Sequence, residues 1–143
     1  MRIAIVVAQF NDFVTSRLRD GAMAQLRDAG VETDDVRVFE VPGAFEVPQM
    51  AAKLAAGGGY DGVVCLGCLI RGATPHFDYI ASAVAHGITQ AALDTGVPMS
   101  FGVLTTNSAE EALERAVDGP SNKGREAAQA VIDMARAFGA AAS

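Results

Sequence analysis

One histidine of this sequence lies where a bound anion could meet a proton donor. Residues 70–78 read Ile-Arg-Gly-Ala-Thr-Pro-His-Phe-Asp and join an apolar run to a helical pattern. Thr74 suits a helix N-cap, Pro75 suits the first helical position, and Gly72 lets the main chain approach a ligand. Free N–H groups at such a turn bind anions, and histidine is the usual acid–base group near neutral pH. The segment therefore predicts a site for a small phosphorylated substrate with His76 as its catalytic residue, the alternative being a plain strand–helix connection.

A carboxylate and two aromatic rings follow other apolar runs of the chain. Residues 42–46 read Pro-Gly-Ala-Phe-Glu and come directly after a predicted strand, which places Glu46 at a helix start. Its carboxylate can accept hydrogen bonds from the hydroxyls of a sugar or polyol, or it can simply complement the helix dipole. Phe10 and Phe101 stand near strand ends, where a ring either stacks on a heterocycle or packs in the core. Both pairs of alternatives stay open on residue type alone.

Basic residues flank the last loop of the chain. Arg115, Lys123 and Arg125 lie around the segment Asn122-Lys123-Gly124, which precedes a helical pattern. In an acidic protein, cations beside a helix start point to a phosphate. A solvated helix face is the alternative, and it is the commoner one for any single Arg or Lys.

The two cysteines are expected to be buried thiols. Cys65 and Cys68 lie in one predicted strand at an odd spacing, so their side chains point to opposite faces. No second Cys or His pair completes a zinc or redox motif, and His76, Asp78 and Glu46 would make a weak metal ligand set. Nucleophile-elbow, P-loop and dinucleotide-binding motifs do not occur in the sequence. We therefore expect an enzyme that uses neither a metal nor an organic cofactor.

Short apolar runs alternate with helical patterns along all 143 residues. Strands are predicted over residues 3–8, 36–41, 62–70 and 98–105, and helices over 12–29, 42–56, 75–95, 108–117 and 122–138. This alternation predicts one α/β domain over 1–143, a flavodoxin-like three-layer αβα sandwich with a four-stranded parallel sheet of order 2-1-3-4. Ligands of such sheets bind beyond the carboxyl ends of the strands. The alanine-rich end after Gly139 is expected to fray.

Charge and hydropathy limit the possible partners. The formal net charge is −6, so a nucleic acid, which needs a basic surface, is not expected. No apolar run approaches the roughly 20 residues of a membrane span, and the short apolar start has no signal cleavage site. Two closely spaced cysteines form no disulfide framework, which fits a reducing cytoplasm.

Five segments carry a family resemblance. They are Phe10-Asn11-Asp12, residues 42–46, residues 70–79, Phe101-Gly102-Val103 and Asn122-Lys123-Gly124. In order and spacing, over nearly the whole chain, they resemble lumazine synthase, the penultimate enzyme of riboflavin biosynthesis. The resemblance implies a transferase that condenses 5-amino-6-(D-ribitylamino)uracil with 3,4-dihydroxy-2-butanone 4-phosphate. Phosphate and water leave, and 6,7-dimethyl-8-ribityllumazine forms.

The resemblance also implies roles for the residues that match the family motifs. On the heterocycle side, Phe10 would stack on the pyrimidine, and its edge would be read by the main chain of Cys68, Leu69 and Ile70. The ribityl chain and ring would be held by Ala44, Phe45 and Glu46. On the phosphate side, Ala73 and Thr74 would bind the butanone phosphate and His76 would move protons. The neighbouring subunit would supply Phe101 and Arg115, with Lys123 and Glu126 near the same site.

The resemblance further implies a homo-oligomer built from pentamers. The loop before Asn122 has no insertion, which is compatible with a shell of sixty subunits, although it lacks a lysine that the family often carries there. One rival interpretation is the related pentameric riboflavin synthase of archaea, and a second is a non-catalytic flavin-binding or shell protein. Joint retention of Glu46, His76, Arg115 and Lys123 favours an active lumazine synthase.

Overall fold

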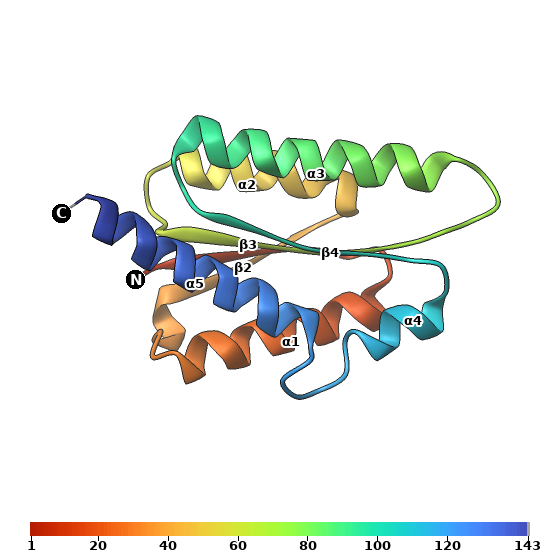
Figure 1. Ribbon diagram of the computed structural model, residues 1–143, viewed down its shortest axis with the longest axis horizontal. Helices are drawn as coiled ribbons and strands as arrows, with labels where there is room; N and C mark the ends of the chain where they lie inside the picture. Colours follow the sequence, from red (N-terminus) through yellow and green to blue (C-terminus); the bar gives the residue numbers. More distant parts are fainter. Residues whose placement is uncertain (143) are drawn as a thin grey trace.

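The computed structural model describes residues 1–142 and forms three layers around a single sheet (Figure 1). The strands β1 (Ile3–Ala8), β2 (Val36–Val41), β3 (Gly62–Ile70) and β4 (Met99–Thr106) are all parallel. Their order across the sheet is β2-β1-β3-β4. The predicted α/β sandwich and strand order are therefore confirmed.

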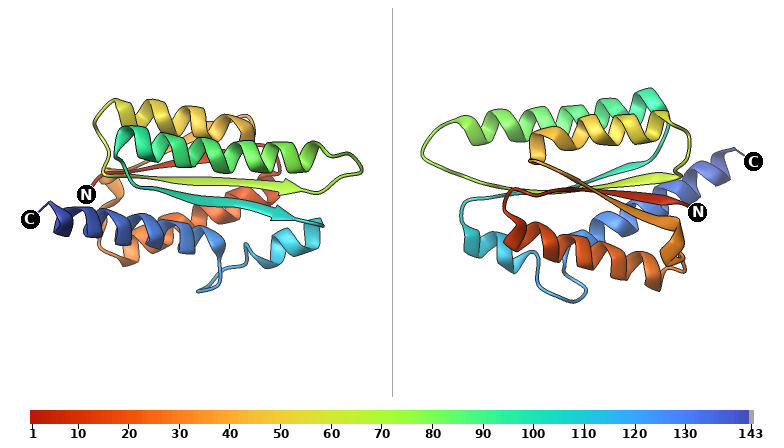
Figure 2. Two further views of the ribbon diagram at one scale, coloured as in Figure 1. Left: turned by 45° about the horizontal axis from the view of Figure 1, so that its top comes forward. Right: turned by 180° about the vertical axis from the view of Figure 1, so that it is seen from behind.

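Helices cover both faces of the sheet (Figures 1 and 2). On one side lie α1 (Asp12–Asp28), α5 (Lys123–Ala141) and the short α4 (Ala109–Glu114), and on the other lie α2 (Val47–Ala56) and α3 (His76–Thr95). Two 3₁₀ turns, η1 (Thr33–Asp35) and η2 (Ala44–Glu46), flank β2. Within residues 1–142 no helix has both the length and the apolar character needed to cross a bilayer.

The central strand β1 shows how the sequence builds two cores. All of its residues are buried, because helices cover both of its faces. Ile3, Ile5 and Val7 pack toward α1 and α5, whereas the smaller Ala4, Val6 and Ala8 pack toward α2 and α3. The period of two along a strand thus divides one continuous apolar run between two separate cores.

The two cysteines occupy opposite cores, as their odd spacing predicts. Cys65 packs toward α2 and α3, and Cys68 packs toward α1 and α5. Both are free and buried. Burial disfavours the thiolate, so it raises the pKa of Cys65 to about 12 and that of Cys68 to about 11. Both side chains are neutral thiols at physiological pH.

Several predicted element ends were wrong. Helix α2 starts at Val47 rather than at residue 42, because residues 44–46 form the separate 3₁₀ turn η2. Strand β4 starts at Met99 rather than Pro98, because proline lacks an N–H, and it extends to Thr106, which pairs with Ile70. Helix α4 ends at Glu114 rather than near Val117. Helix α5 does not fray at Gly139 but continues to Ala141, because the alanines around that glycine favour helix.

Candidate active site

A cavity of about 490 Å³ opens at the carboxyl edge of the sheet, between the ends of β1, β2 and β3 and the start of α3. This is the edge where β1 and β3 lead to helices on opposite faces, the usual ligand position in a doubly wound sheet. The volume and the mainly apolar lining suit a small organic ligand. The lining residues are Phe10, Asn11, Pro42, Gly43, Ala44, Phe45, Glu46, Leu69, Ile70, Gly72, Thr74, His76, Phe77 and Ile80.

Phe10 is held in place by an extension of the β1–β2 ladder beyond the strands. The Gln9 N–H donates to the Val41 carbonyl at 2.8 Å, and the Phe10 N–H donates to the Pro42 carbonyl at 3.0 Å. The Phe10 side chain is nevertheless 69 % exposed. A large apolar ring fixed at its main chain and open to solvent on a cavity wall is suited to stacking against a flat ligand.

Asn11 fixes the same wall to the third strand. Its backbone is left-handed, with φ 65° and ψ 44°, and its Nδ2 donates to the Cys68 carbonyl at 2.9 Å. Asparagine tolerates this conformation better than most residues. Sequence reasoning did not place Asn11 among the site residues, although an asparagine directly after a buried strand is a usable signal for such a turn.

Glu46 lines the cavity with its carboxylate close to the main chain of Gly43. The Glu46 N–H donates to the Gly43 carbonyl at 3.1 Å within the turn that starts η2. A Cβ atom at Gly43 would stand only 3.2 Å from Glu46 Oε1, so the carboxylate lies folded over this glycine. Ala44 is buried beneath, and Phe45 is exposed. The turn therefore presents one carboxylate and one aromatic ring to a ligand.

The segment from Gly72 to Pro75 forms an open turn before α3. Within residues 1–142 the N–H groups of Gly72, Ala73, Thr74, His76 and Phe77 have no hydrogen-bond acceptor. These free donors, at the positive end of a twenty-residue helix, have the geometry and charge that suit binding of an anion. The structure thus has the unsatisfied N–H groups that the sequence predicted here.

The cap of α3 differs from the prediction. Pro75, not Thr74, is the N-cap, and no side chain caps the helix. The Pro75 carbonyl accepts from the N–H groups of Asp78 at 3.1 Å and Tyr79 at 3.4 Å, so helical bonding begins at the proline. The Thr74 side chain lines the cavity instead.

His76 is the first residue of α3, and its imidazole lines the cavity. It is exposed, and its side chain makes no hydrogen bond within residues 1–142, which leaves both ring nitrogens accessible to a ligand. Phe77 and Ile80 share the lining and were not predicted. Ile80 lies four residues after His76, so the helical period could have revealed it.

Some predicted site residues lie outside this cavity in the single chain. Ala73 lies in the open turn between two lining residues, and the Cys68 thiol faces the opposite core while its carbonyl meets Asn11. Phe101 and Lys123 line a separate groove of about 430 Å³ between β4 and α5. Lys123 Nζ pairs there with Glu126 Oε2 at 2.7 Å.

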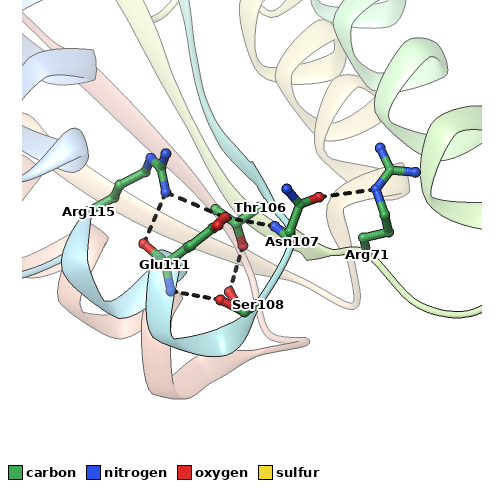
Figure 3. Close-up of polar contacts among 6 residues, drawn as sticks. All are labelled: Arg71, Thr106, Asn107, Ser108, Glu111 and Arg115. Atoms are coloured by element: carbon green, nitrogen blue, oxygen red, sulfur yellow. Dashed lines mark hydrogen bonds and ion pairs between the residues drawn. The ribbon is translucent and has the colours of Figure 1, made fainter.

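Arg115 lies just after α4, some way along the sheet edge from Arg71 (Figure 3). Its Nη1 donates to the Glu111 carbonyl at 3.2 Å and stands 4.0 Å from Glu111 Oε2. That carboxylate also accepts from the Asn107 N–H at 2.9 Å. The guanidinium is half exposed and weakly held, and is therefore able to contact a second molecule.

The start of α5 is not a free anion site, although its residues suggested one. Buried Asn122 caps the helix by accepting from the N–H groups of Gly124 at 2.8 Å and Arg125 at 3.1 Å. Its Nδ2 donates to the Ala116 carbonyl at 3.0 Å. The segment Asn122-Lys123-Gly124 therefore joins α4 to α5, and its first N–H groups are already occupied.

The acidic residues near His76 do not gather around a common point. No three His, Cys, Asp or Glu side chains of residues 1–142 lie close enough to hold a metal ion. Asp78, one member of the weak metal ligand set considered from the sequence, is paired with both terminal nitrogens of Arg71 at 3.2 Å.

Comparison with known proteins agrees with this geometry. The chain matches the family described as 6,7-dimethyl-8-ribityllumazine synthase over residues 1–138. It is 52 % identical over 134 residues to a 6,7-dimethyl-8-ribityllumazine synthase of Syntrophus aciditrophicus (strain SB), a stretch that covers 94 % of this chain and 87 % of that relative. The resemblance predicted from five short segments is confirmed, and the chain belongs to the 6,7-dimethyl-8-ribityllumazine synthase family.

Proposed function

We propose that this protein is a transferase that condenses 5-amino-6-(D-ribitylamino)uracil with 3,4-dihydroxy-2-butanone 4-phosphate to form 6,7-dimethyl-8-ribityllumazine. The observation that carries the proposal is a single cavity in which a stacking ring, a carboxylate, an open anion-binding turn and a free histidine meet. Family membership supplies the identity of the reaction.

The pyrimidine and its ribityl chain fit the wall formed by β1 and β2. Phe10 stacks on the pyrimidine, and the main chain at Cys68, Leu69 and Ile70 reads the edge of the ring. The Glu46 carboxylate accepts hydrogen bonds from ribityl hydroxyls, beside Ala44 and Phe45. Support comes from the exposure of Phe10 and Phe45, which a bound ligand would cover.

The butanone phosphate fits the open turn. The N–H groups at Ala73 and Thr74 bind its phosphate, and His76 transfers protons as the amine adds to the carbonyl and as water and phosphate leave. Holding both substrates in one cavity contributes further, since alignment of two reactants is worth up to about 7–11 kcal/mol.

The phosphate needs a cation that this cavity lacks. Neither Arg nor Lys is among the cavity-lining residues of the described chain, and Arg71 beside the turn is already paired. We infer a homo-oligomer in which a neighbouring copy supplies Arg115 to the phosphate and Phe101 to the ring, with Lys123 nearby. Half-exposed Phe101 on the edge strand β4 supports such a contact. A cytoplasmic pentamer is the proposed assembly, and a shell of sixty subunits is compatible with it.

A direct assay tests the reaction. Purified protein is mixed with both substrates, and formation of lumazine and release of phosphate are followed together against the uncatalysed background. We expect both products at equal rates, and none when either substrate is omitted. Failure to accelerate the condensation, or conversion of lumazine alone to riboflavin, would refute the proposal. Native mass measurement of the same sample reports the assembly.

A further inference from the structure

Arg71 closes the open turn from outside. It stands directly before Gly72, and it reaches across the turn to Asp78 in the first turn of α3. Its Nη1 and Nη2 donate to the two Asp78 carboxylate oxygens, each at 3.2 Å. Its guanidinium also lies 4.5 Å from the centre of the Phe77 ring, which lines the cavity. The fork and the ring contact join the two ends of the segment that carries the free N–H groups.

The turn needs such a brace because it has no internal bonds. Gly72, Ala73 and Thr74 neither donate nor accept a hydrogen bond within residues 1–142. Their N–H groups must stay free to bind an anion, so ladder or turn hydrogen bonds cannot hold this main chain in place. Contacts at its two ends are the remaining way to restrict it.

The brace is also tied to the sheet. The Arg71 N–H donates to the Thr106 carbonyl at 2.8 Å, which extends the β3–β4 ladder. Figure 3 shows the Arg71 side chain reaching Asn107, whose Oδ1 accepts from Nε at 3.2 Å. Asn107 in turn donates its N–H to Glu111 on α4. Arg71 therefore connects the turn to the end of β4 as well as to α3.

These contacts use every nitrogen of the Arg71 side chain. Nε is bonded to Asn107, and the fork is bonded to Asp78. A guanidinium whose three nitrogens are all bonded to protein oxygens is suited to hold these neighbours in place. We propose that Arg71, together with Asp78, is a positioning residue that holds residues 72–77 in their phosphate-binding arrangement. This inference rests on the proposed function of the turn.

The pair is exposed, with 46 % of the Arg71 side chain and 60 % of the Asp78 side chain accessible. Exposed ion pairs contribute little to global stability. We therefore expect loss of the Arg71–Asp78 pair to weaken binding of the phosphorylated substrate while hardly changing the melting temperature of the protein.

A double-mutant cycle tests this role. We expect Arg71→Gln and Asp78→Asn each to raise KM for the butanone phosphate by about 3- to 10-fold, with KM for the aminouracil changed less than 2-fold, because only the phosphate turn loosens. The double variant should be no worse than Arg71→Gln alone, because that substitution already removes the pair with Asp78 along with the Asn107 and Phe77 contacts. Arg71→Lys keeps the charge without the fork and should recover only part of the loss. Melting temperatures should stay within about 2 °C of the wild type.

Arg19→Gln is the matched control, since Arg19 forms another exposed pair, with Asp20, away from the cavity. It should leave both KM values unchanged. If Asp78→Asn lowers KM for the butanone phosphate while Arg71→Gln raises it, Arg71 binds the phosphate directly and the positioning role is wrong. Unchanged KM in both variants also overturns it. Titration of each assembled variant with inorganic phosphate measures the same comparison without turnover. A wild-type protein that binds phosphate but does not catalyse the condensation would refute the proposed reaction, while leaving the positioning role of Arg71 intact.

Discussion

Two turns border the cavity, and they are built in opposite ways. After β1, the main chain at Gln9 and Phe10 bonds to β2, and the Asn11 side chain bonds to β3. After β3, residues 72–74 have no hydrogen bond at all within the described chain. The first turn is held in place by hydrogen bonds to its two neighbouring strands. The second leaves its N–H groups without a partner in the described chain and open to a ligand.

The difference follows from what each turn contacts in the proposed reaction. A stacking ring gains from a fixed position, so its N–H groups are used to hold it. An anion is bound by the N–H groups themselves, and a donor already paired within the protein is lost to the ligand. We therefore expect substitutions at the first turn to lower the free energy of unfolding, and substitutions at the second to weaken substrate binding or turnover. The following substitutions test that division.

The largest effect is expected for a substitution beside the open turn, and it should appear in turnover but not in stability. His76→Ala should reduce kcat by about 10- to 10⁴-fold, since proton transfer is lost while substrate alignment remains. The melting temperature should not change, because the exposed His76 side chain makes no hydrogen bond within the described chain. His86→Ala is the matched control on the same helix, because His86 lies outside the cavity and its Nδ1 is 3.5 Å from the Ser82 hydroxyl. Full turnover in an assembled His76→Ala protein would contradict the assigned role.

The next effect concerns the cation that the open turn lacks. Arg115→Ala should cost about 1.5–3 kcal/mol of transition-state binding, which is about 10- to 150-fold in kcat/KM, because a charge-assisted contact to phosphate is removed. Subunits of Arg115→Ala and His76→Ala are then dissociated and mixed. Shared sites predict partial recovery of activity, because some contacts pair an intact His76 with an intact Arg115. No recovery after proven mixing would place each site within one chain.

At the bonded turn we expect an effect on folding. Asn11→Ala should lower the free energy of unfolding by about 2–3 kcal/mol, because alanine loses the Cys68 hydrogen bond and is strained in the left-handed region. Asn11→Gly relieves the strain and should lose only about 1 kcal/mol. Denaturant unfolding at one protomer concentration measures both. Equal losses would mean that backbone strain plays no part at this position.

The smallest effect concerns the two buried thiols of β3. Burial raises the pKa of Cys65 to about 12 and that of Cys68 to about 11, from 9.0. Stability from these neutral thiols is complete below pH 9.0 and falls as the pH rises toward those values, because the unfolded chain ionises first. At pH 8 a disulfide reagent should modify the native protein far more slowly than the denatured one. Asn11→Ala should accelerate labelling of Cys68 more than of Cys65, as mass spectrometry can show; rapid labelling of Cys65 in the wild type would contradict its burial.

Local sequence patterns predicted the strands of the fold. They did not predict which residue caps α3. Apolar runs bounded by Gly, Pro and polar residues identified three strands to the residue. At residues 74–75, however, Thr and Pro are both good residues for a helix start. Local preference could not decide between them, and the main-chain path from β3 to α3 placed the cap at Pro75.

The sequence by itself determined the buried thiols and the chemical character of the strand ends, because these depend on periodicity and residue type, and it indicated the sheet order through the alternation of strands and helices. Only the tertiary structure decided which donors are free. The helix start at residues 122–124 suggested a phosphate site, yet Asn122 occupies its N–H groups as the cap of α5, and Asp78 is paired with Arg71. Asn11 looked like an ordinary turn residue, yet it joins two strand ends 57 positions apart. The partners of a polar side chain are set by residues distant in the chain, so neither spacing nor propensity along one segment can reveal them.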